Sequence, residues 1–521
     1  MILDTKILEQ KIDKLFTVWT DHQPGPGAQL LITYKGQPLF EKCYGYANIE
    51  TGTPITPDSV FHLASISKTF TAMAIMMLHE AGKLNVYDDI RKYIPDLIKV
   101  KEPITIKNML NHVSGFKCHY SLFHIQGRSG DDLILHSEMV KLLSRQTELN
   151  FKPNDEFMYS NPNYVFLAEI VKRVTGLTLH QFLKKNIFEP LGMTKTLVRD
   201  DPRVIIPNRV NSYSDNGYEF KNAILNLCMY GSTGVQSTCR EVTELFKQFS
   251  NPTLISRKTM EEIMFDIPVR SDGKKGNYAG GVRIDELLGH KFIHHGGVNA
   301  GFRTVCQNYV DDDLIVTLFG NTYNIPIETA ARDIARIVLE IPARVPKSLK
   351  DYREDEPCFE GVGGLYYCDR NRDNFQLEIK DGVPYLDGVH LEQLDGSIFK
   401  QGRLNMTVSF GKDKIAICDN GNIMEMRKLE GYVDESYMEK CVGRYYCEAC
   451  EGIWDVVIKN GKLTMENLRH PDKTLNWLRD DEFFSGLTKI EFVREADGTV
   501  SGLRYSTSNA RNMKFVRIQH V

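Results

Sequence analysis

The stretch FHLASISKTFTAMAIMMLHEAG, residues 61–82, joins a short apolar run to two serines, a lysine and a long helical pattern. Apolar residues recur at helical spacing after the lysine, and Gly82, a residue type common just past helix C-termini, ends the pattern. Because residues three apart share a helix face, Ser65 and Lys68 can touch, whereas Ser67 points elsewhere. The stretch therefore predicts a helix that begins beside a serine–lysine pair.

This pair is suited to nucleophilic chemistry. A serine hydroxyl attacks only when a neighbouring group accepts its proton, and a lysine amine accepts one when burial or a nearby cation lowers its pKa. The helix start adds unpaired N–H groups and a positive dipole end, which stabilise an oxyanion. Ser-x-x-Lys also arises by chance in a long chain, and the alternative is a solvated helix start with Ser65 as a cap.

Two further segments place polar side chains where they can join this pair. YSN, residues 159–161, directly precedes a helical pattern, so that a loop can deliver a phenol and an amide into a cleft. HHGG, residues 294–297, ends a strand-like run, and its glycines allow a substrate to approach the strand backbone closely. His112, in NHVSG, is predicted to be a packing or capping residue. SISK, YSN and HHGG together predict an active site.

SISK at residues 65–68, YSN at 159–161 and HHG at 294–296 resemble the three motifs of the serine β-lactamase and penicillin-binding protein family, SxxK, YxN and KTG in its HxG form. Connecting text such as MLNHVSGF and GSTGVQST is similar to the class C branch and its esterase and peptidase relatives. The resemblance runs over most of residues 25–340. It implies a β-lactamase/transpeptidase-like domain, an antiparallel sheet flanked by helices.

The resemblance implies a role for each matching residue. Ser65 would be the acylated nucleophile, Lys68 its proton acceptor, and Tyr159 the group that relays a proton to the leaving group. Whether Lys68 or Tyr159 is the base in acylation stays open, because the two titrate as a coupled pair. Asn161 would hydrogen-bond the amide or ester of the substrate.

The strand glycines are also expected to bind substrate. The resemblance implies that Gly296 and Gly297 lie against it. In such folds the oxyanion hole pairs the N–H of the nucleophile with a strand N–H, which is expected near Gly297 in this chain.

One departure from the penicillin-binding pattern bears on the substrate class. Where the KTG form offers a cationic lysine to a substrate carboxylate, this chain offers His294, which is largely neutral at pH 7. Carboxylate recognition is weakened, so β-lactamase and DD-carboxypeptidase activities are disfavoured. His294 can still hydrogen-bond Tyr159 and take part in proton transfer, and the alternative is a structural histidine.

A substrate with a free amine would require an anion instead. In D-aminopeptidase-like members of the family, a loop of an appended barrel is thought to supply it. The matching loop here is RHPDKTLNWLRDDEF, residues 469–483, in which Asp480 or Asp481 would pair with an α-ammonium group. A solvated turn explains the same residues equally simply.

The chain is organised into segments of different texture. Early strands, a helical middle and late strands up to about residue 340 predict an α+β domain whose sheet forms from both ends. After a Pro- and charge-rich linker, GLYYC recurs as GRYYC, and IKDG recurs at the same offset as IKNG. These alternating strands with tight turns predict two antiparallel β-barrels. The expected domains are a catalytic domain, 1–342, and barrels at 343–434 and 435–521, a plan that resembles D-aminopeptidases.

Composition limits the partners and cofactors. The 521 residues carry a formal net charge of −4 without a basic stretch, so nucleic acid is not an expected partner. The start of the chain has the pattern of an amphipathic helix, not of a signal peptide, and no stretch is apolar for long enough to span a membrane, which predicts a cytoplasmic protein. The 11 cysteines fit reduced thiols, and the lone Cys447-x-x-Cys450 motif does not predict a metal site. No cofactor is expected.

The sequence thus predicts a serine hydrolase that works through an acyl-enzyme, an aminopeptidase or amidase releasing N-terminal D-amino acids from small peptides or amides. One alternative is an esterase or β-lactamase-like hydrolase that uses the same motifs. Another is a ligand-binding sensor in which Ser65 is acylated without turnover. For the barrels, homodimer formation and binding of a partner are both compatible with the sequence.

Overall fold

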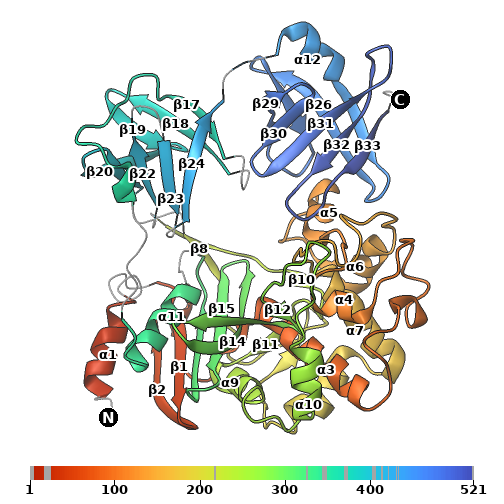
Figure 1. Cartoon of the computed structure of the whole chain (residues 1–521), viewed down its shortest axis with the longest axis vertical. Helices are drawn as coiled ribbons and strands as arrows, with labels where there is room; N and C mark the ends of the chain where they lie inside the picture. Colours follow the sequence, from red (N-terminus) through yellow and green to blue (C-terminus); the bar gives the residue numbers. More distant parts are fainter. Residues whose placement is uncertain are drawn as a thin grey trace. The chain divides into compact units, whose positions relative to one another are not determined.

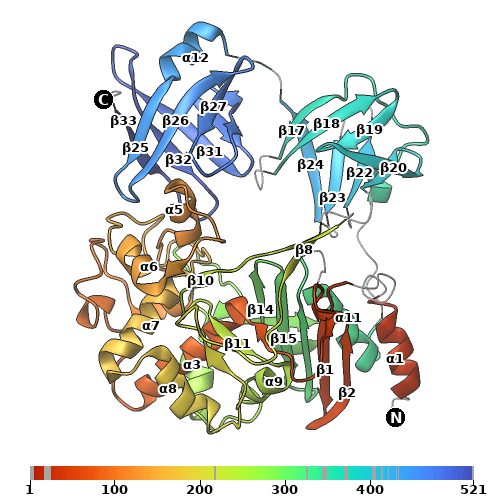
Figure 2. The ribbon, with the colours of Figure 1, turned by 180° about the vertical axis from the view of Figure 1, so that it is seen from behind.

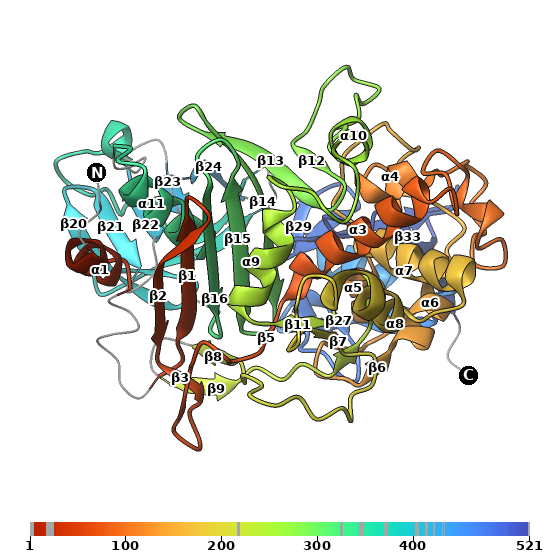
Figure 3. The same cartoon turned by 90° about the horizontal axis from the view of Figure 1, so that it is seen from below.

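A seven-stranded antiparallel sheet is assembled from both ends of the first 340 residues (Figure 3). In spatial order, its strands are β12 (Tyr278–Ala279), β13 (Val282–Leu287), β14 (His290–Asn299), β15 (Phe302–Tyr309), β16 (Leu314–Gly320), β1 (Ala28–Tyr34) and β2 (Gln37–Tyr44). Strands β1 and β2 meet at Lys35 and Gly36, whose φ angles of 52° and 72° are those that a two-residue hairpin turn requires. The predicted origin of the sheet is confirmed.

This computed structural model divides the chain into two units, shown from the front and back in Figures 1 and 2. The first comprises residues 1–124 and 128–343, and the second residues 125–127 and 344–521. No helix in the described ranges is long and apolar enough to cross a membrane. The structure describes residues 5–16, 25–215, 219–323, 327–342, 349–368, 373–401, 406–411, 415–419, 422–429, 431 and 433–518.

Helices cover both faces of the seven-stranded sheet. On one face, α1 (Thr5–Asp13) and α11 (Ile327–Val338) bury their apolar residues in a common core with the strands. On the other face, α9 (Cys239–Lys247) packs against β1, β15 and β16, and the Thr243 hydroxyl lies 2.7 Å from that of Thr317. The amphipathic helix predicted at the start of the chain is confirmed.

A separate group of helices includes the helix that follows Ser65 and the helix that follows YSN. α3 (Ser67–Glu80) packs against α7 (Pro162–Thr175), which ends at Gly176 with a φ of 73°, the left-handed conformation that glycine favours after a helix. The remaining helices of the first unit are α4 (Ile106–Leu110), α5 (His119–Ile125), α6 (His136–Leu143), α8 (Leu179–Leu183) and α10 (Arg257–Thr259), with short turns η1 (Ala64–Ile66), η2 (Ile90–Lys92), η3 (Lys184–Phe188) and η4 (Met260–Met264).

Small sheets of two or three strands lie outside the seven-stranded sheet. The one that positions the serine motif has the order β5, β11, β7, and β5 is the strand that leads into η1. The bounds of the small strands are β3 (Tyr46–Asn48), β4 (Thr53–Pro54), β5 (Phe61–His62), β6 (Ile134–Leu135), β7 (Leu197–Val198), β8 (Tyr213–Asp215), β9 (Phe220–Asn222), β10 (Leu227–Cys228) and β11 (Val235–Ser237).

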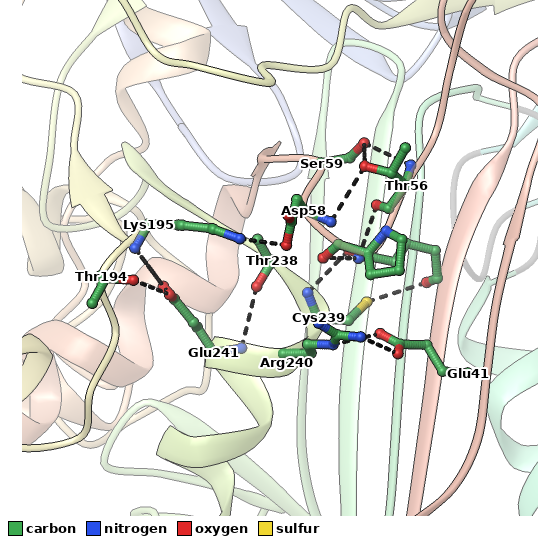
Figure 4. A network of polar contacts seen from close by, with 12 residues as sticks. Glu41, Thr56, Asp58, Ser59, Thr194, Lys195, Thr238, Cys239, Arg240 and Glu241 are labelled. Carbon is green, nitrogen blue, oxygen red and sulfur yellow. Dashed lines mark hydrogen bonds and ion pairs between the residues drawn. The ribbon is translucent and has the colours of Figure 1, made fainter.

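A polar network anchors the chain just before β5 (Figure 4). Lys195 pairs with Asp58, and the Lys195 backbone N–H donates to Glu241 of α9 at 2.9 Å. On the same helix, Arg240 makes two parallel bonds to Glu41 of β2, at 2.9 and 2.6 Å. Such exposed pairs add little stability each, so their effect here is to fix the position of one element relative to another.

The second unit contains two antiparallel β-barrels. The first barrel is closed, and the second is a nine-stranded, nearly closed sheet with the order β28-β27-β26-β25-β33-β32-β31-β30-β29. The predicted fold class, α+β with two barrels after the catalytic domain, is confirmed. The repeated IKDG and IKNG segments form equivalent hairpin turns, with positive φ at Asp381, Gly382, Asn460 and Gly461.

The strands of the closed barrel are β17 (Gly364–Tyr367), β18 (Asn374–Lys380), β19 (Val383–Leu386), β20 (Val389–Asp395), β21 (Ile398–Gln401), β22 (Met406–Phe410), β23 (Ile415–Asp419) and β24 (Asn422–Lys428), preceded by η5 (Leu349–Tyr352). The second barrel comprises α12 (Glu435–Cys441), β25 (Gly443–Cys447), β26 (Gly452–Lys459), β27 (Lys462–Glu466), β28 (Lys473–Thr474), β29 (Asn476–Arg479), β30 (Glu482–Ser485), β31 (Thr488–Arg494), β32 (Val500–Ser506) and β33 (Met513–Ile518).

Candidate active site

Ser65 lies in the short turn η1, directly before α3. The preceding residue, Ala64, has a φ of 48°, a backbone conformation that costs a non-glycine residue free energy, and its N–H donates to His62 Nδ1 at 3.1 Å. Ser65 is half-buried. Ser67, in contrast, is fully buried, and its hydroxyl accepts a hydrogen bond from the N–H of Val235 at 3.0 Å. The strained turn therefore presents Ser65 and ties Ser67 into the fold.

Lys68 lies beneath Ser65 and has no exposed surface. Its Nζ lies 3.1 Å from Ser65 Oγ, donates to the carbonyl of Ser232 at 2.8 Å, and lies 4.8 Å from the centre of the Tyr159 ring. No carboxylate pairs with it within the described ranges. Burial consequently lowers the pKa of Lys68 well below its usual value. The predicted Ser65–Lys68 contact is present, and the neutral amine is favoured.

Tyr159 completes a cluster with these two residues. Its hydroxyl is buried and has no hydrogen-bond partner in the part of the chain that the structure describes. Burial raises the pKa of Tyr159, and the adjacent Ser65 hydroxyl, without reaching full hydrogen-bond geometry, partly opposes that rise. Asn161 lies at the start of α7, where its Nδ2 is 3.8 Å from Cys118 Sγ. An orphaned phenol beside a buried lysine is an arrangement that a substrate can complete.

Two aromatic residues that the sequence did not single out as catalytic enclose Tyr159. The centre of the His112 ring lies 4.3 Å from the centre of the Tyr159 ring and 4.6 Å from that of Tyr278. Burial, with a smaller contribution from Lys68, lowers the pKa of His112 well below its usual value, so its ring is neutral. His112 Nδ1 accepts the N–H of Ser160 at 3.1 Å and so holds the YSN loop. His112 thus has the predicted packing role, and the residue it packs against, Tyr159, belongs to the active site.

The HHGG strand differs from the expected arrangement. His294 was expected to face Tyr159, but its Nε2 lies 2.8 Å from Asp285 and its ring stacks on Phe292, whose side chain is in the core beneath α11. His295 is the histidine on the catalytic side of β14, with its ring centre 6.4 Å from that of Tyr159. Successive strand residues point to opposite faces, so neighbouring histidines cannot both reach Tyr159.

His295 is held in place by its own bonds. Its Nε2 lies 3.0 Å from the Tyr278 hydroxyl, and its Nδ1 lies 2.6 Å from the carbonyl of Gly296. Burial and the nearby Lys68 lower the pKa of His295 well below its usual value. A neutral imidazole therefore links the strand to the tyrosine cluster.

Gly296 and Gly297 lie where β14 meets two other elements. A methyl group on Gly297 would lie 2.3 Å from the carbonyl oxygen of Leu63 and 3.0 Å from the Ala64 side chain, and one on Gly296 would lie 2.1 Å from a Glu328 carboxylate oxygen. Strand β13 pairs with β14 only as far as His294, so the edge beyond it is free of β13. That edge, beside η1, places the Gly297 backbone next to the nucleophile's turn.

Asp480 and Asp481 belong to the second unit, whereas Ser65 belongs to the first. They form the turn between β29 and β30, where Asp480 has a φ of 40°. Asp481 already pairs with Arg494 at 2.7 Å and accepts a hydrogen bond from the Tyr437 hydroxyl. Their pairing with a substrate ammonium group stays a prediction.

The cysteine pair of the second barrel is buried. Cys447 and Cys450 have sulfur atoms 3.3 Å apart and no exposed surface. Among the described residues, no group of three or more histidine, cysteine or acidic side chains is arranged to hold a metal ion.

Comparison with known proteins identifies the family. Residues 12–339 match the family model described as Beta-lactamase. The chain belongs to the beta-lactamase family. It is 23% identical to a D-aminopeptidase of Brucella anthropi, over 96% of both chains. The family resemblance inferred from the three motifs is confirmed, and the protein is a hydrolase of this family.

Solved structures of other proteins share the fold. The octameric penicillin-binding protein homologue from Pyrococcus abyssi superposes with a TM-score of 0.60 at 19% identity, covering 99% of this chain and all of its own. The D-amino acid amidase from Ochrobactrum anthropi SV3, complexed with D-phenylalanine, gives a TM-score of 0.54 at 20% identity, covering 64% of this chain and 98% of its own. The first likeness extends over the whole chain, the barrels included.

Proposed function

We propose that this beta-lactamase family member is an acyl-enzyme serine hydrolase that releases N-terminal D-amino acids from small peptides or amides. The observation that carries the proposal is the Ser65–Lys68 contact of 3.1 Å, in which the lysine is buried without a carboxylate partner among the described residues. One relative that matches along nearly the whole chain is a D-aminopeptidase, which supports the choice of substrate.

The proposed mechanism begins with proton transfer from Ser65. Neutral Lys68 accepts the proton as Ser65 Oγ attacks the carbonyl carbon, and the backbone N–H groups of Ser65 and Gly297 stabilise the oxyanion. Tyr159 then relays a proton to the leaving amine, which departs and leaves an ester on Ser65. Water hydrolyses this ester by the reverse sequence of proton transfers. Tyr159 as the acylation base remains the alternative, since the two groups are coupled.

Recognition of the free α-ammonium group requires an anion near the nucleophile. Glu328, an exposed residue of α11, places a carboxylate oxygen against Gly296, and its charge contributes to the raised pKa of Tyr159. We include Glu328 as a candidate partner of the ammonium group, beside the loop residues Asp480 and Asp481. A carboxylate there disfavours substrates that carry their own negative charge at this position.

A substrate panel tests the proposal. Wild type, Ser65→Ala and the control Ser67→Ala are assayed on the p-nitroanilides of D-alanine and L-alanine, on p-nitrophenyl acetate and on nitrocefin. We expect the D-alanine anilide to be the best substrate and Ser65→Ala to be inactive. Equal activity of wild type and Ser65→Ala would remove the nucleophile assignment. A preference for the ester or nitrocefin would favour the esterase or β-lactamase alternative, and trapped acyl-Ser65 without release would favour a sensor.

We also propose that the chain self-associates, as a homodimer or a larger assembly. The support is the likeness, over the whole chain, to the penicillin-binding protein homologue from Pyrococcus abyssi, which is octameric. Light scattering coupled to size-exclusion chromatography measures the assembly, and a monomer over the working concentration range would contradict the proposal.

A further inference from the structure

A cavity of about 260 Å³ lies in the first unit, apart from the serine cluster. His62 of β5, Gln236 of β11 and Phe302 of β15 line it together with residues from the chain between β7 and β10. Neither Ser65, Lys68 nor Tyr159 is among its lining residues. A volume of this size holds a small molecule or ion with its hydration water.

Two guanidinium groups line this cavity, those of Arg199 and Arg209. Arg199 donates to the carbonyl oxygen of Pro202 at 2.9 Å, while its Nε is buried and has no hydrogen-bond partner in the described part of the chain. Within the same ranges, neither arginine forms an ion pair with a carboxylate. Both arginines line the same cavity, and partial burial, with repulsion from Arg199, lowers the pKa of Arg209.

Two acidic residues near the arginines have partners other than Arg199 and Arg209. Glu50 lines it, and its carboxylate accepts a hydrogen bond from Asn222 at 2.8 Å. Asp201, close to Arg199 in sequence, makes a two-bond ion pair with Arg203, with one N–O distance of 2.7 Å. The cavity lining carries two cations, Arg199 and Arg209, against one carboxylate, Glu50, and so leaves the cavity positive.

His62 lines the same cavity as the two arginines. Burial, with added repulsion from Arg199 and Arg209, lowers the pKa of His62 to about 3, so the ring is neutral at physiological pH. Its Nδ1 accepts the N–H of Ala64, the residue before the nucleophile, and its Nε2 lies 3.3 Å from the Thr233 hydroxyl. The ring thus joins the cavity wall to the turn that presents Ser65.

We propose that this cavity is a binding site for a small anion, with a carboxylate or phosphate group held by Arg199 and Arg209. Guanidinium groups bind both kinds of oxyanion through paired N–H donors, and the orphaned Nε of Arg199 supplies one such donor. The proposal rests on the cavity and its charges, and it stands independently of the reaction assigned to Ser65.

Calorimetric titration of the full chain tests the site. Inorganic phosphate and succinate are titrated separately, in a low-salt buffer without other oxyanions, into wild type, Arg199→Gln, Arg209→Gln and the control Arg203→Gln. We expect saturable binding of at least one anion to wild type, and the tighter of the two identifies the class. Each of the first two variants is expected to weaken binding by at least about tenfold, and the control, whose arginine is exposed and paired with Asp201, to bind as wild type does.

Three results would overturn the proposal. They are the absence of saturable binding of both anions to wild type, unchanged binding to Arg209→Gln, and an equal loss in Arg203→Gln. Arg209 is exposed, so its variant should fold even where Arg199→Gln does not, and it carries the test alone in that case.

Discussion

Lys68 is a residue whose burial decides its chemistry. A charged amine without a carboxylate partner is costly in the interior, so the same burial that disfavours its proton makes it a base towards Ser65. Arginine at this position would keep a similar reach but could not become neutral. We expect Lys68→Arg to lower the acylation rate by about 10³-fold, measured with p-nitrophenyl acetate before steady state.

Lys107→Arg is the matched control for this change. Lys107 is also buried and has a lowered pKa, but it pairs with a carboxylate, that of Asp266, at 3.5 Å. Its variant should keep wild-type acylation. Substantial activity in Lys68→Arg would show that another group, with Tyr159 the first candidate, takes the proton.

The two adjacent histidines of β14 lead to opposite predictions. His295 contacts the tyrosine cluster, so we expect His295→Gln to lower kcat by about 10- to 100-fold. His294 pairs with Asp285, so His294→Gln should lower the free energy of unfolding by about 1–3 kcal/mol and leave kcat near that of wild type. Steady-state kinetics and urea unfolding of both variants distinguish these effects. The reverse result would restore the motif-based assignment of His294 to catalysis.

Glu328 offers a test of the free-amine substrate. Glu328→Gln keeps the shape of the side chain and removes its charge, so we expect KM for the D-alanine anilide to rise by about tenfold. The neutral ester p-nitrophenyl acetate is the internal control and should be turned over as before. An equal loss on both substrates would assign Glu328 a structural role.

The sequence predicts contacts between residues close in the chain better than contacts that depend on strand orientation. Ser65 and Lys68 meet because helical geometry fixes residues three apart, and this contact is present. The choice between His294 and His295 depends on which face of β14 each residue occupies, and a shift of one residue exchanges the faces. The motif spacing does not carry that information. It also does not reveal the contacts that bring His112 and Tyr278 to Tyr159.

At the scale of elements, the close approach of β14 to η1 explains Gly297. A methyl group there would meet the Leu63 carbonyl oxygen and the Thr304 hydroxyl, each at 2.3 Å, so the strand or the nucleophile's turn must move. We expect Gly297→Ala to lower kcat/KM by at least about tenfold through a displaced oxyanion hole. Gly276→Ala, at a position with nothing within 4 Å of an added methyl group, is the control. Unchanged kinetics in Gly297→Ala would separate this strand from the oxyanion hole.

Elements whose ends carry local signals were predictable from sequence, and the cavity was not. Glycines stand just after the ends of α3 and α7, and Asp-Gly and Asn-Gly form the β18–β19 and β26–β27 turns. The cavity is lined by residues from positions 50 to 302, which only the folded chain brings together. No periodicity links such residues, so Arg199 and Arg209 have no signature in the sequence.

At the scale of the whole molecule, buried histidines link stability to pH. Burial lowers the pKa of both His62 and His119 to about 3, and His119 has neither ring nitrogen hydrogen-bonded in the described part of the chain. The unfolded chain binds protons at these sites below about pH 6.5, whereas the folded chain does not until about pH 3. Stability is therefore complete above about pH 6.5 and falls as the pH decreases through this window.

His119→Leu isolates one of these contributions. Each such histidine lowers the free energy of unfolding by up to about 1.4 kcal/mol per pH unit, so the urea midpoint should fall less steeply in the variant between about pH 7 and pH 5. His390→Leu, at an exposed position of β20, should follow wild type. Parallel slopes for wild type and His119→Leu would mean that His119 is protonated in the folded chain, which its apolar surroundings beside Phe123 oppose.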